Sequence, residues 1–220
     1  MFEFEHKVAV KICGVMSSAE ALLCAGAGAD MIGLNFSPQS VRCITPETGA
    51  EIVAAAREQF RQLKFVGVFV DQEREFVETV AAELALDAVQ LHGTETPGYV
   101  HDLKVPSVIK ALRVSGTPDV SACRCDAILL DTFSAKAPGG TGETFPWSIA
   151  AELRPQVSRL ILAGGLTSAN VAEAIRTVRP FAVDVCSGVE SSPGHKDEAK
   201  VRAFLRAVEE FNHEKTAIRA

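Results

Sequence analysis

The chain has 220 residues, a formal net charge of −6, and 47% apolar against 23% charged residues. These values are typical of one globular domain with a sizeable core, and the negative charge argues against binding to nucleic acid or to an anionic membrane. No apolar run is long enough to span a bilayer, and the acidic N-terminus lacks the pattern of a signal peptide. We therefore expect a cytoplasmic protein that acts on a small molecule, with no membrane anchor and no obligate protein partner.

Six cysteines are spread along the chain. Without an export signal, such cysteines are expected to be reduced thiols rather than disulfides. Cys123 and Cys125 are the only close pair in the sequence, and no second pair completes a four-ligand zinc site. No GxGxxG fingerprint follows a predicted strand either. We therefore expect neither a metal nor an organic cofactor.

Short apolar segments alternate with amphipathic segments from one end of the chain to the other. The apolar segments are short, rich in β-branched residues and flanked by glycine or polar residues, which is typical of buried strands. The segments predicted as strands are Val8–Cys13, Met31–Phe36, Phe65–Val70, Asp87–His92, Val108–Leu112, Ala127–Asp131, Leu160–Ala163 and Phe181–Val185.

Segments with apolar residues at helical spacing follow most of these strands. Ser17 or Ser18 is expected to cap the first helix. Thr45 is expected to cap the second helix, with Pro46 at its first position, and Thr167 is expected to cap the helix after the seventh strand. The fifth strand is followed by a poorly marked connection, and the sixth by a long loop rich in glycine.

This alternation, without a linker or a low-complexity segment, predicts a single-domain (β/α)₈ TIM barrel over residues 1–220. Residues 1–7 are expected to be an N-terminal extension of that barrel. The alternative is an open doubly wound sheet, which usually has fewer strands.

In such a barrel the carboxyl ends of all strands face one rim, so residues far apart in sequence meet there. Cys13 ends the first strand and Asp131 ends the sixth, and a thiol facing a carboxyl group could perform general acid–base chemistry. A nearby cation or helix start would lower the pKa of the thiol, and burial would raise that of the carboxyl. Taken alone, Cys13 is more often a small buried hydrophobe, and Asp131 is equally a helix or loop cap.

Glycine-rich loops lie where barrels of this kind usually hold a phosphate, after the seventh and eighth strands. The long sixth loop could add backbone amides and close over the ligand. One glycine pair would indicate only a turn, but together these loops predict a phosphate site. Its candidate residues are Gly140 and Gly142 in the sixth loop, Gly164 and Gly165 in the seventh, and Ser187 and Gly188 in the eighth.

Three basic residues lie on or near the predicted rim. Arg42 in the second loop could hold a carboxylate or a phosphate in a bidentate fork, although a solvated surface arginine is the ordinary alternative. Lys11 and Lys110 lie on strands, and a buried lysine can form a Schiff base. Lys11 lies two residues below the rim, which favours a structural role or an influence on the charge of the site.

A series of short motifs then gives a resemblance to a known family. Between about Val10 and Val208 the chain resembles the phosphoribosylanthranilate isomerases of tryptophan biosynthesis. Each motif alone is weak, but their order and spacing are specific. They are KICG at Lys11–Gly14, VGVFV at Val66–Val70, QLHG at Gln90–Gly93, LLDT at Leu129–Thr132, GGTG at Gly139–Gly142, GGL at Gly164–Leu166, DVCSGVE at Asp184–Glu190 and PGHKD at Pro193–Asp197.

The resemblance implies the Amadori rearrangement of N-(5′-phosphoribosyl)anthranilate to 1-(2-carboxyphenylamino)-1-deoxyribulose 5-phosphate, without a cofactor. It implies that Cys13 is the general base and Asp131 the general acid. It further implies that Arg42 holds the anthranilate carboxylate and that Asp184 lines the same site. His92, at the end of the fourth strand, is expected to bind the substrate as well.

The chain departs from the family pattern at three positions. Cys186 stands where relatives commonly carry serine, which puts a hydroxyl contact to phosphate in doubt while Ser187 is retained. Glu143 and Pro146 replace the usual lysine and aspartate after the GGTG turn. Two alternatives to the isomerase stay open: a Schiff-base aldolase or synthase on a phosphate-binding barrel, and a non-catalytic protein that binds a phosphosugar.

Overall fold

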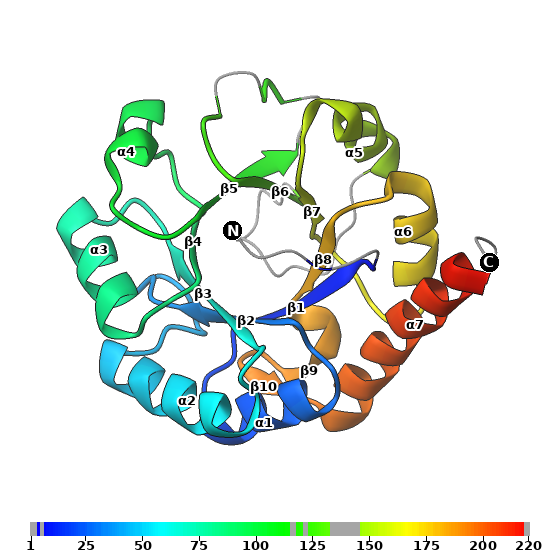
Figure 1. Ribbon diagram of the computed structural model, residues 1–220, viewed down its shortest axis with the longest axis horizontal. Coiled ribbons are helices and arrows are strands. Elements are labelled where there is room, and N and C mark those ends of the chain that lie inside the picture. Colours follow the sequence, from blue (N-terminus) through cyan, green and yellow to red (C-terminus); the bar gives the residue numbers. More distant parts are fainter. Residues whose placement is uncertain (1–3, 5–6, 115–117, 121–122, 133–145, 218–220) are drawn as a thin grey trace.

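The computed structural model describes residues 4, 7–114, 118–120, 123–132 and 146–217. Figure 1 looks down a ring of strands that is surrounded by helices. The strands of the ring are β1 (Ala9–Cys13), β2 (Met31–Asn35), β3 (Lys64–Phe69), β4 (Ala88–Leu91), β5 (Val108–Val114), β6 (Ala127–Thr132), β7 (Leu160–Leu162) and β8 (Ala182–Val185).

The ring is a closed barrel of parallel strands in the order β1-β2-β3-β4-β5-β6-β7-β8. It closes through the pairing of β1 with β8, in which Ala9 lies opposite Ala182. The predicted (β/α)₈ barrel is therefore confirmed, and the open doubly wound sheet is wrong because the first and last strands pair, which leaves the sheet without an edge strand.

The helices form the outer layer of the barrel (Figure 1). Between β5 and β6, the described residues 118–120 and 123–126 contain no helix. None of the helices in the described ranges is long and apolar enough to cross a bilayer. The helices are α1 (Ser18–Gly26), α2 (Pro46–Gln59), α3 (Arg74–Glu83), α4 (Pro97–Asp102), α5 (Trp147–Leu153), α6 (Val171–Val178) and α7 (Glu198–Ala217), with short 3₁₀ helices η1 (Arg154–Gln156) and η2 (Ser187–Val189).

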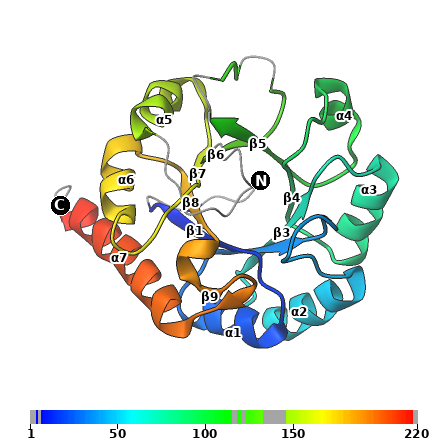
Figure 2. The same cartoon turned by 180° about the vertical axis from the view of Figure 1, so that it is seen from behind.

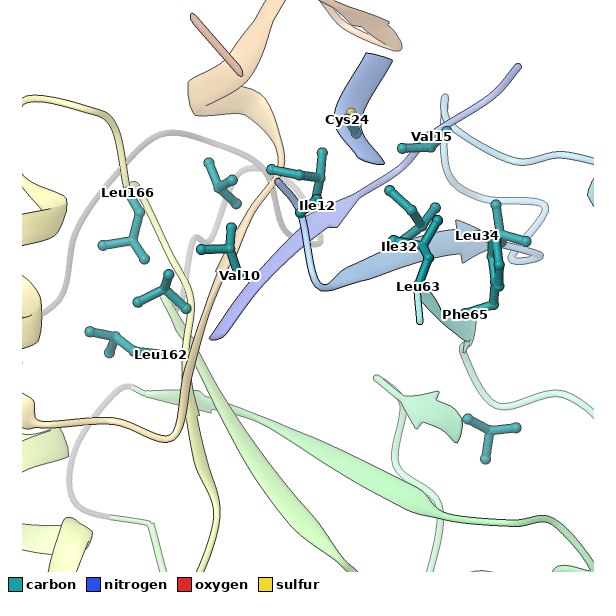
Figure 3. Packing of buried hydrophobic residues seen from close by; sticks show 14 of the residues in the cluster. Val10, Ile12, Val15, Cys24, Ile32, Leu34, Leu63, Phe65, Leu162 and Leu166 are labelled. Carbon is teal, nitrogen blue, oxygen red and sulfur yellow. The ribbon is translucent and has the colours of Figure 1, made fainter. Parts of the chain in front are cut away.

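The strands bury two different faces because successive side chains point to opposite sides of a sheet. One face packs against the helices, and Figure 3 shows Ile12, Ile32 and Cys24 in this outer layer. The other face fills the barrel interior with small and branched residues such as Ala9 and Ile161. This alternation puts Lys11 and Cys13 on the inner face of β1.

Two of the predicted helix caps are confirmed and one is wrong. The side chain of Ser17 accepts a hydrogen bond from Glu20 N, and that of Thr45 accepts one from Thr48 N. Helix α6 begins at Val171 rather than beside Thr167, and Asn170 is its N-cap. Asn170 Oδ1 accepts a bond from Thr167 N and Asn170 Nδ2 donates to Gly165 O, so this side chain ties down the loop before the helix.

After β8 the chain forms η2 and then a small antiparallel hairpin, β9 (Glu190–Ser192) and β10 (His195–Lys196). Figure 2 shows β9 between α7 and α1, at the outside of the barrel. At the N-terminal end, Phe4 packs against Phe181 with ring centroids 5.7 Å apart. Lys7 forms an ion pair with Asp30, so the described residues before β1 contact the barrel.

Candidate active site

A cavity of about 470 Å³ opens at the carboxyl ends of the barrel strands. Side chains and backbone from β1, β2, β3, β4, β5, β6 and β8 line it, so it collects residues from almost the whole ring. The predicted site residues that line it are Cys13, Arg42, His92, Asp131 and Asp184. The thiol and the carboxyl group singled out in the sequence thus share one cavity.

Cys13 ends β1 and is buried at the wall of the cavity. Gly33 on the neighbouring β2 gives its side chain room, because a Cβ at Gly33 would lie 2.8 Å from Cys13 Sγ and 3.0 Å from Lys11 Nζ. Burial raises the pKa of the Cys13 thiol, although the charge of Lys11 opposes this shift. The expected lowering of this pKa by the site does not occur, because desolvation exceeds the effect of the nearby cation.

Lys11 is the cation beside this thiol, and it is completely buried inside the barrel. Its Nζ donates to Asp184 Oδ1 at 3.0 Å. Burial lowers the pKa of the Lys11 ammonium, but the interactions with Asp184 and Cys13 together outweigh burial and hold that pKa above its usual value. A lysine kept charged in this way is a poor nucleophile, which argues against Schiff-base chemistry at Lys11.

Lys110, the other Schiff-base candidate, is held by the loop after β4. Its Nζ donates to Gly93 O at 2.7 Å and to Glu95 Oε2 at 2.6 Å. The other oxygen of Glu95 accepts bonds from Asp71 N and Gly93 N. This buried ion pair therefore supports the backbone that carries His92, and no pattern in the sequence indicates this role of Glu95.

His92 lies at the cavity wall directly after β4. Burial, together with the charges of Lys11 and Arg113, lowers the pKa of His92 to about 3. The imidazole is therefore neutral at physiological pH, and one of its ring nitrogens can accept a hydrogen bond while the other donates.

Gln90, which in the sequence stands out only as part of the QLHG motif, also lines the cavity and is 1% exposed. Its Oε1 has no hydrogen-bond partner among the described residues. Since buried polar atoms are normally paired, an unpaired oxygen at a cavity wall is a signal for ligand contact. In the sequence, a polar residue at an inward position of an apolar strand could have indicated it.

Arg42 reaches the cavity from the loop after β2, and its guanidinium is held by Glu190. Arg42 Nε donates to Glu190 Oε1 at 2.7 Å, and Nη2 donates to Oε2 at 2.6 Å. These bonds, more than any other influence, keep the pKa of Arg42 above its ordinary value. Within the described structure this bidentate fork holds a carboxylate of the protein itself, Glu190, so the predicted grip on a ligand stays a prediction.

The predicted phosphate loops lie at the ends of β7 and β8. Gly164 and Gly165 have φ values of 87° and 61°, which favour glycine. Ser187 and Gly188 form part of the short 3₁₀ helix η2. These residues are not among those that line the cavity. Gly140 and Gly142 lie outside the described residues.

Comparison with known proteins assigns the family. A profile of the N-(5′-phosphoribosyl)anthranilate (PRA) isomerase family matches residues 10–207. The chain belongs to this family. A PRA isomerase of Geobacter sulfurreducens is 48% identical over 202 residues, which are 90% of this chain and 97% of that protein.

Solved PRA isomerase structures have the same barrel. The enzyme of Thermus thermophilus is 35% identical to this chain, with a TM-score of 0.84. The match covers 92% of this chain and 99% of the Thermus chain. A PRA isomerase in complex with reduced 1-(o-carboxyphenylamino)-1-deoxyribulose 5-phosphate is 38% identical, with a TM-score of 0.80 and the same coverage. The resemblance read from the motifs is thereby confirmed at the level of the family.

Three residues depart from the PRA isomerase pattern: Cys186, Pro146 and Glu143. Cys186 lines the cavity, and burial raises the pKa of its thiol to about 12, so it is an uncharged group. Pro146 is the residue before α5. Glu143 lies outside the described residues. Among the described residues no cluster of histidine, cysteine and acidic side chains could hold a metal ion.

Proposed function

We propose that this chain, an isomerase by family, converts N-(5′-phosphoribosyl)anthranilate to 1-(2-carboxyphenylamino)-1-deoxyribulose 5-phosphate by general acid–base catalysis. The observation that carries the proposal is that Cys13 and Asp131 line one cavity together with Arg42. Further support comes from a relative, 38% identical, that was solved with a reduced form of the expected product.

In this mechanism Asp131 protonates the ring oxygen of the ribose. The ring opens to an iminium ion, in which the anthranilate nitrogen withdraws electrons from the sugar. Cys13, as thiolate, then removes the proton from C2′, and the resulting enolamine tautomerises to the ketone. The proton that Asp131 gives up and the proton that Cys13 gains are exchanged with solvent after product release.

The thiol needs help to ionise, because burial raises its pKa. The positive charge of Lys11 favours the thiolate, and this ammonium stays charged because it is paired with Asp184. Lys11 therefore acts on the general base through charge. This role agrees with the sequence-based expectation that Lys11 influences the charge of the site.

The two ends of the substrate carry negative charge and need separate binding sites. Arg42 is proposed to bind the anthranilate carboxylate, with Asp184 and His92 lining the same region of the cavity. Backbone amides after β7 and β8 are proposed to bind the phosphate. The residues proposed for the phosphate are Gly164, Gly165, Ser187 and Gly188, together with Gly140 and Gly142 of the sixth loop.

We further propose that the enzyme works in the cytoplasm on a free small molecule, without nucleic acid, a membrane or an obligate protein partner. All six cysteines are unpaired thiols in the structure. Unpaired thiols are typical of a reducing compartment.

The decisive experiment follows the fluorescence of the anthranilate group while the purified protein turns over N-(5′-phosphoribosyl)anthranilate. A protein-dependent change that is abolished in Cys13→Ala is the expected result. Binding without conversion would indicate the non-catalytic phosphosugar-binding protein instead. A substrate adduct trapped on Lys110 or Lys11 by borohydride would support the Schiff-base enzyme. We expect no adduct, because both lysines are held in buried ion pairs.

A further inference from the structure

The guanidinium of Arg42 is paired with a carboxylate of the protein, which offsets its positive charge. Its Nε and Nη2 both donate to the carboxylate of Glu190, at 2.7 and 2.6 Å. An arginine and a glutamate in such a fork have no net charge as a pair. A neutral pair would attract a second carboxylate only weakly, since most of the attraction in anion binding is electrostatic.

A second cation, Lys196, offsets the negative charge of Glu190. Lys196 Nζ lies 2.9 Å from Glu190 Oε1, and the lysine side chain is 0% exposed. Arg42 and Lys196 contribute one positive charge each and Glu190 one negative charge, so the group of three carries a net charge of +1. Arg42 lines the cavity, whereas Glu190 and Lys196 are not among its lining residues.

The three charges persist at neutral pH. Burial raises the pKa of the Glu190 carboxyl, but the hydrogen bonds and charges of Arg42 and Lys196 together outweigh burial and bring it to about 2. Burial lowers the pKa of Lys196, but neighbouring groups, Glu190 among them, raise it above its ordinary value. The adjacent Cys186 thiol has a pKa of about 12 and stays neutral. Lys200 donates to the backbone oxygen of Glu190 rather than to its carboxylate.

The group is fixed from outside the cavity. Glu190 begins β9 and Lys196 ends β10, so one hairpin carries both side chains. Glu20 on α1 ties this hairpin to the loop after β1, because its two carboxylate oxygens accept bonds from Lys196 N and Met16 N, each at 2.9 Å. The hairpin that holds Arg42 is therefore itself tied by hydrogen bonds to α1 and to the loop after β1.

We infer that Lys196 is a positioning residue that acts through its charge: it compensates Glu190, so that Arg42 is held in place and still carries a surplus positive charge for the anthranilate carboxylate. The inference rests on the proposed function, because it concerns the carboxylate of that substrate. Glu190 orients the guanidinium, and Lys196 prevents Glu190 from cancelling its charge.

The test measures binding by calorimetry with two probes. One is reduced 1-(o-carboxyphenylamino)-1-deoxyribulose 5-phosphate, and the other is the same compound with a phenyl group that lacks the carboxylate. The variants are Lys196→Met, which lowers the net charge of the group to zero, and Glu190→Gln/Lys196→Met, which returns it to +1. Glu198→Gln, which removes a carboxylate from an exposed ion pair with Arg202, is the matched control.

We expect Lys196→Met to weaken binding of the carboxylate probe roughly tenfold and to leave the other probe unchanged. The double variant should bind the carboxylate probe to within about threefold of the wild type, because its net charge is restored. In turnover, KM should rise in Lys196→Met while kcat changes little, since the carboxylate does not react. Glu198→Gln should behave as the wild type.

An equal loss of affinity for both probes would overturn the inference and make Lys196 a purely structural residue. If Lys196→Met does not fold, the double variant decides, because it contains neither of the two buried charges. A folded double variant that has lost its preference for the carboxylate probe would contradict the inference. Wild-type protein that neither binds nor converts the substrate would instead contradict the proposed function.

Discussion

Lys11 Nζ and Asp184 Oδ1 lie 3.0 Å apart inside the barrel, and their residues are opposite each other in the pairing of β1 with β8. The pair spans the two strands that close the ring, so it exists only because the barrel is closed. It lies directly beneath Cys13 and holds a permanent positive charge next to the thiol. One ion pair therefore connects closure of the fold with the chemistry proposed for the site.

Removing one partner of this pair should be strongly destabilising. Lys11→Met leaves the carboxylate of Asp184 buried without its cation, and we expect a loss of about 3–5 kcal/mol in the free energy of unfolding. Lys11→Met/Asp184→Asn removes both charges and should recover most of that loss. Urea denaturation of the wild type and both variants measures the effect. A cost below about 1 kcal/mol for the single variant would mean that Asp184 is solvated or protonated without its partner.

The assignment of acid and base predicts a specific kinetic pattern. Cys13→Ser and Asp131→Asn should each lower kcat by at least about a hundredfold, because each removes one proton-transfer group. Affinity for the reduced product analogue should change little, since neither group is proposed to hold the carboxylate or the phosphate. Steady-state kinetics and calorimetry on the same preparations separate the two effects. Near-normal turnover by Cys13→Ser would mean that another group removes the C2′ proton.

The neutral His92 should make the protein less stable in mild acid. Its pKa is about 3 in the folded state against an ordinary value of 6.5, so the unfolded chain binds a proton first as the pH falls. Stability is therefore complete above pH 6.5 and is lost as the pH falls towards 3, by up to about 1.4 kcal/mol per pH unit. His92→Asn should remove this loss between pH 6.5 and 5. Denaturant melts across this range compare the two proteins, and parallel curves would exclude His92 as the cause.

The loop after β8 should be intolerant of any side chain at Gly188. A Cβ there would lie 1.9 Å from Leu166 O, which belongs to the loop after β7, and a backbone atom cannot easily move away. We expect Gly188→Ala to displace the two proposed phosphate loops and to raise KM at least about tenfold. Gly98→Ala on α4 is the control, because the nearest atom to its new Cβ is 3.9 Å away. Equal KM values in the two variants would argue against a phosphate site at this position.

The sequence was sufficient for most of the features that depend on local spacing. Two-residue periodicity predicts which face of β1 carries Lys11 and Cys13, and the regular alternation of strands and helices predicts the barrel, because both follow from the geometry of single elements. A barrel has one rim at the carboxyl ends of its strands, so the meeting of Cys13 and Asp131 at one cavity could be predicted as well. Helix boundaries were less certain, as α6 shows: it begins at Val171, and the expected cap Thr167 lies in the loop before it.

Only the tertiary structure decided the charge environment of these residues. Glu190 is separated from Arg42 by 148 positions in the chain, and no local pattern shows that a hairpin after β8 places it behind the guanidinium. The pKa of Cys13 depends on the balance between burial and the charge of Lys11, and the unpaired oxygen of Gln90 depends on which atoms surround it. Desolvation and Coulomb interactions vary with distances of a few ångströms in three dimensions, and spacing along the sequence does not contain those distances.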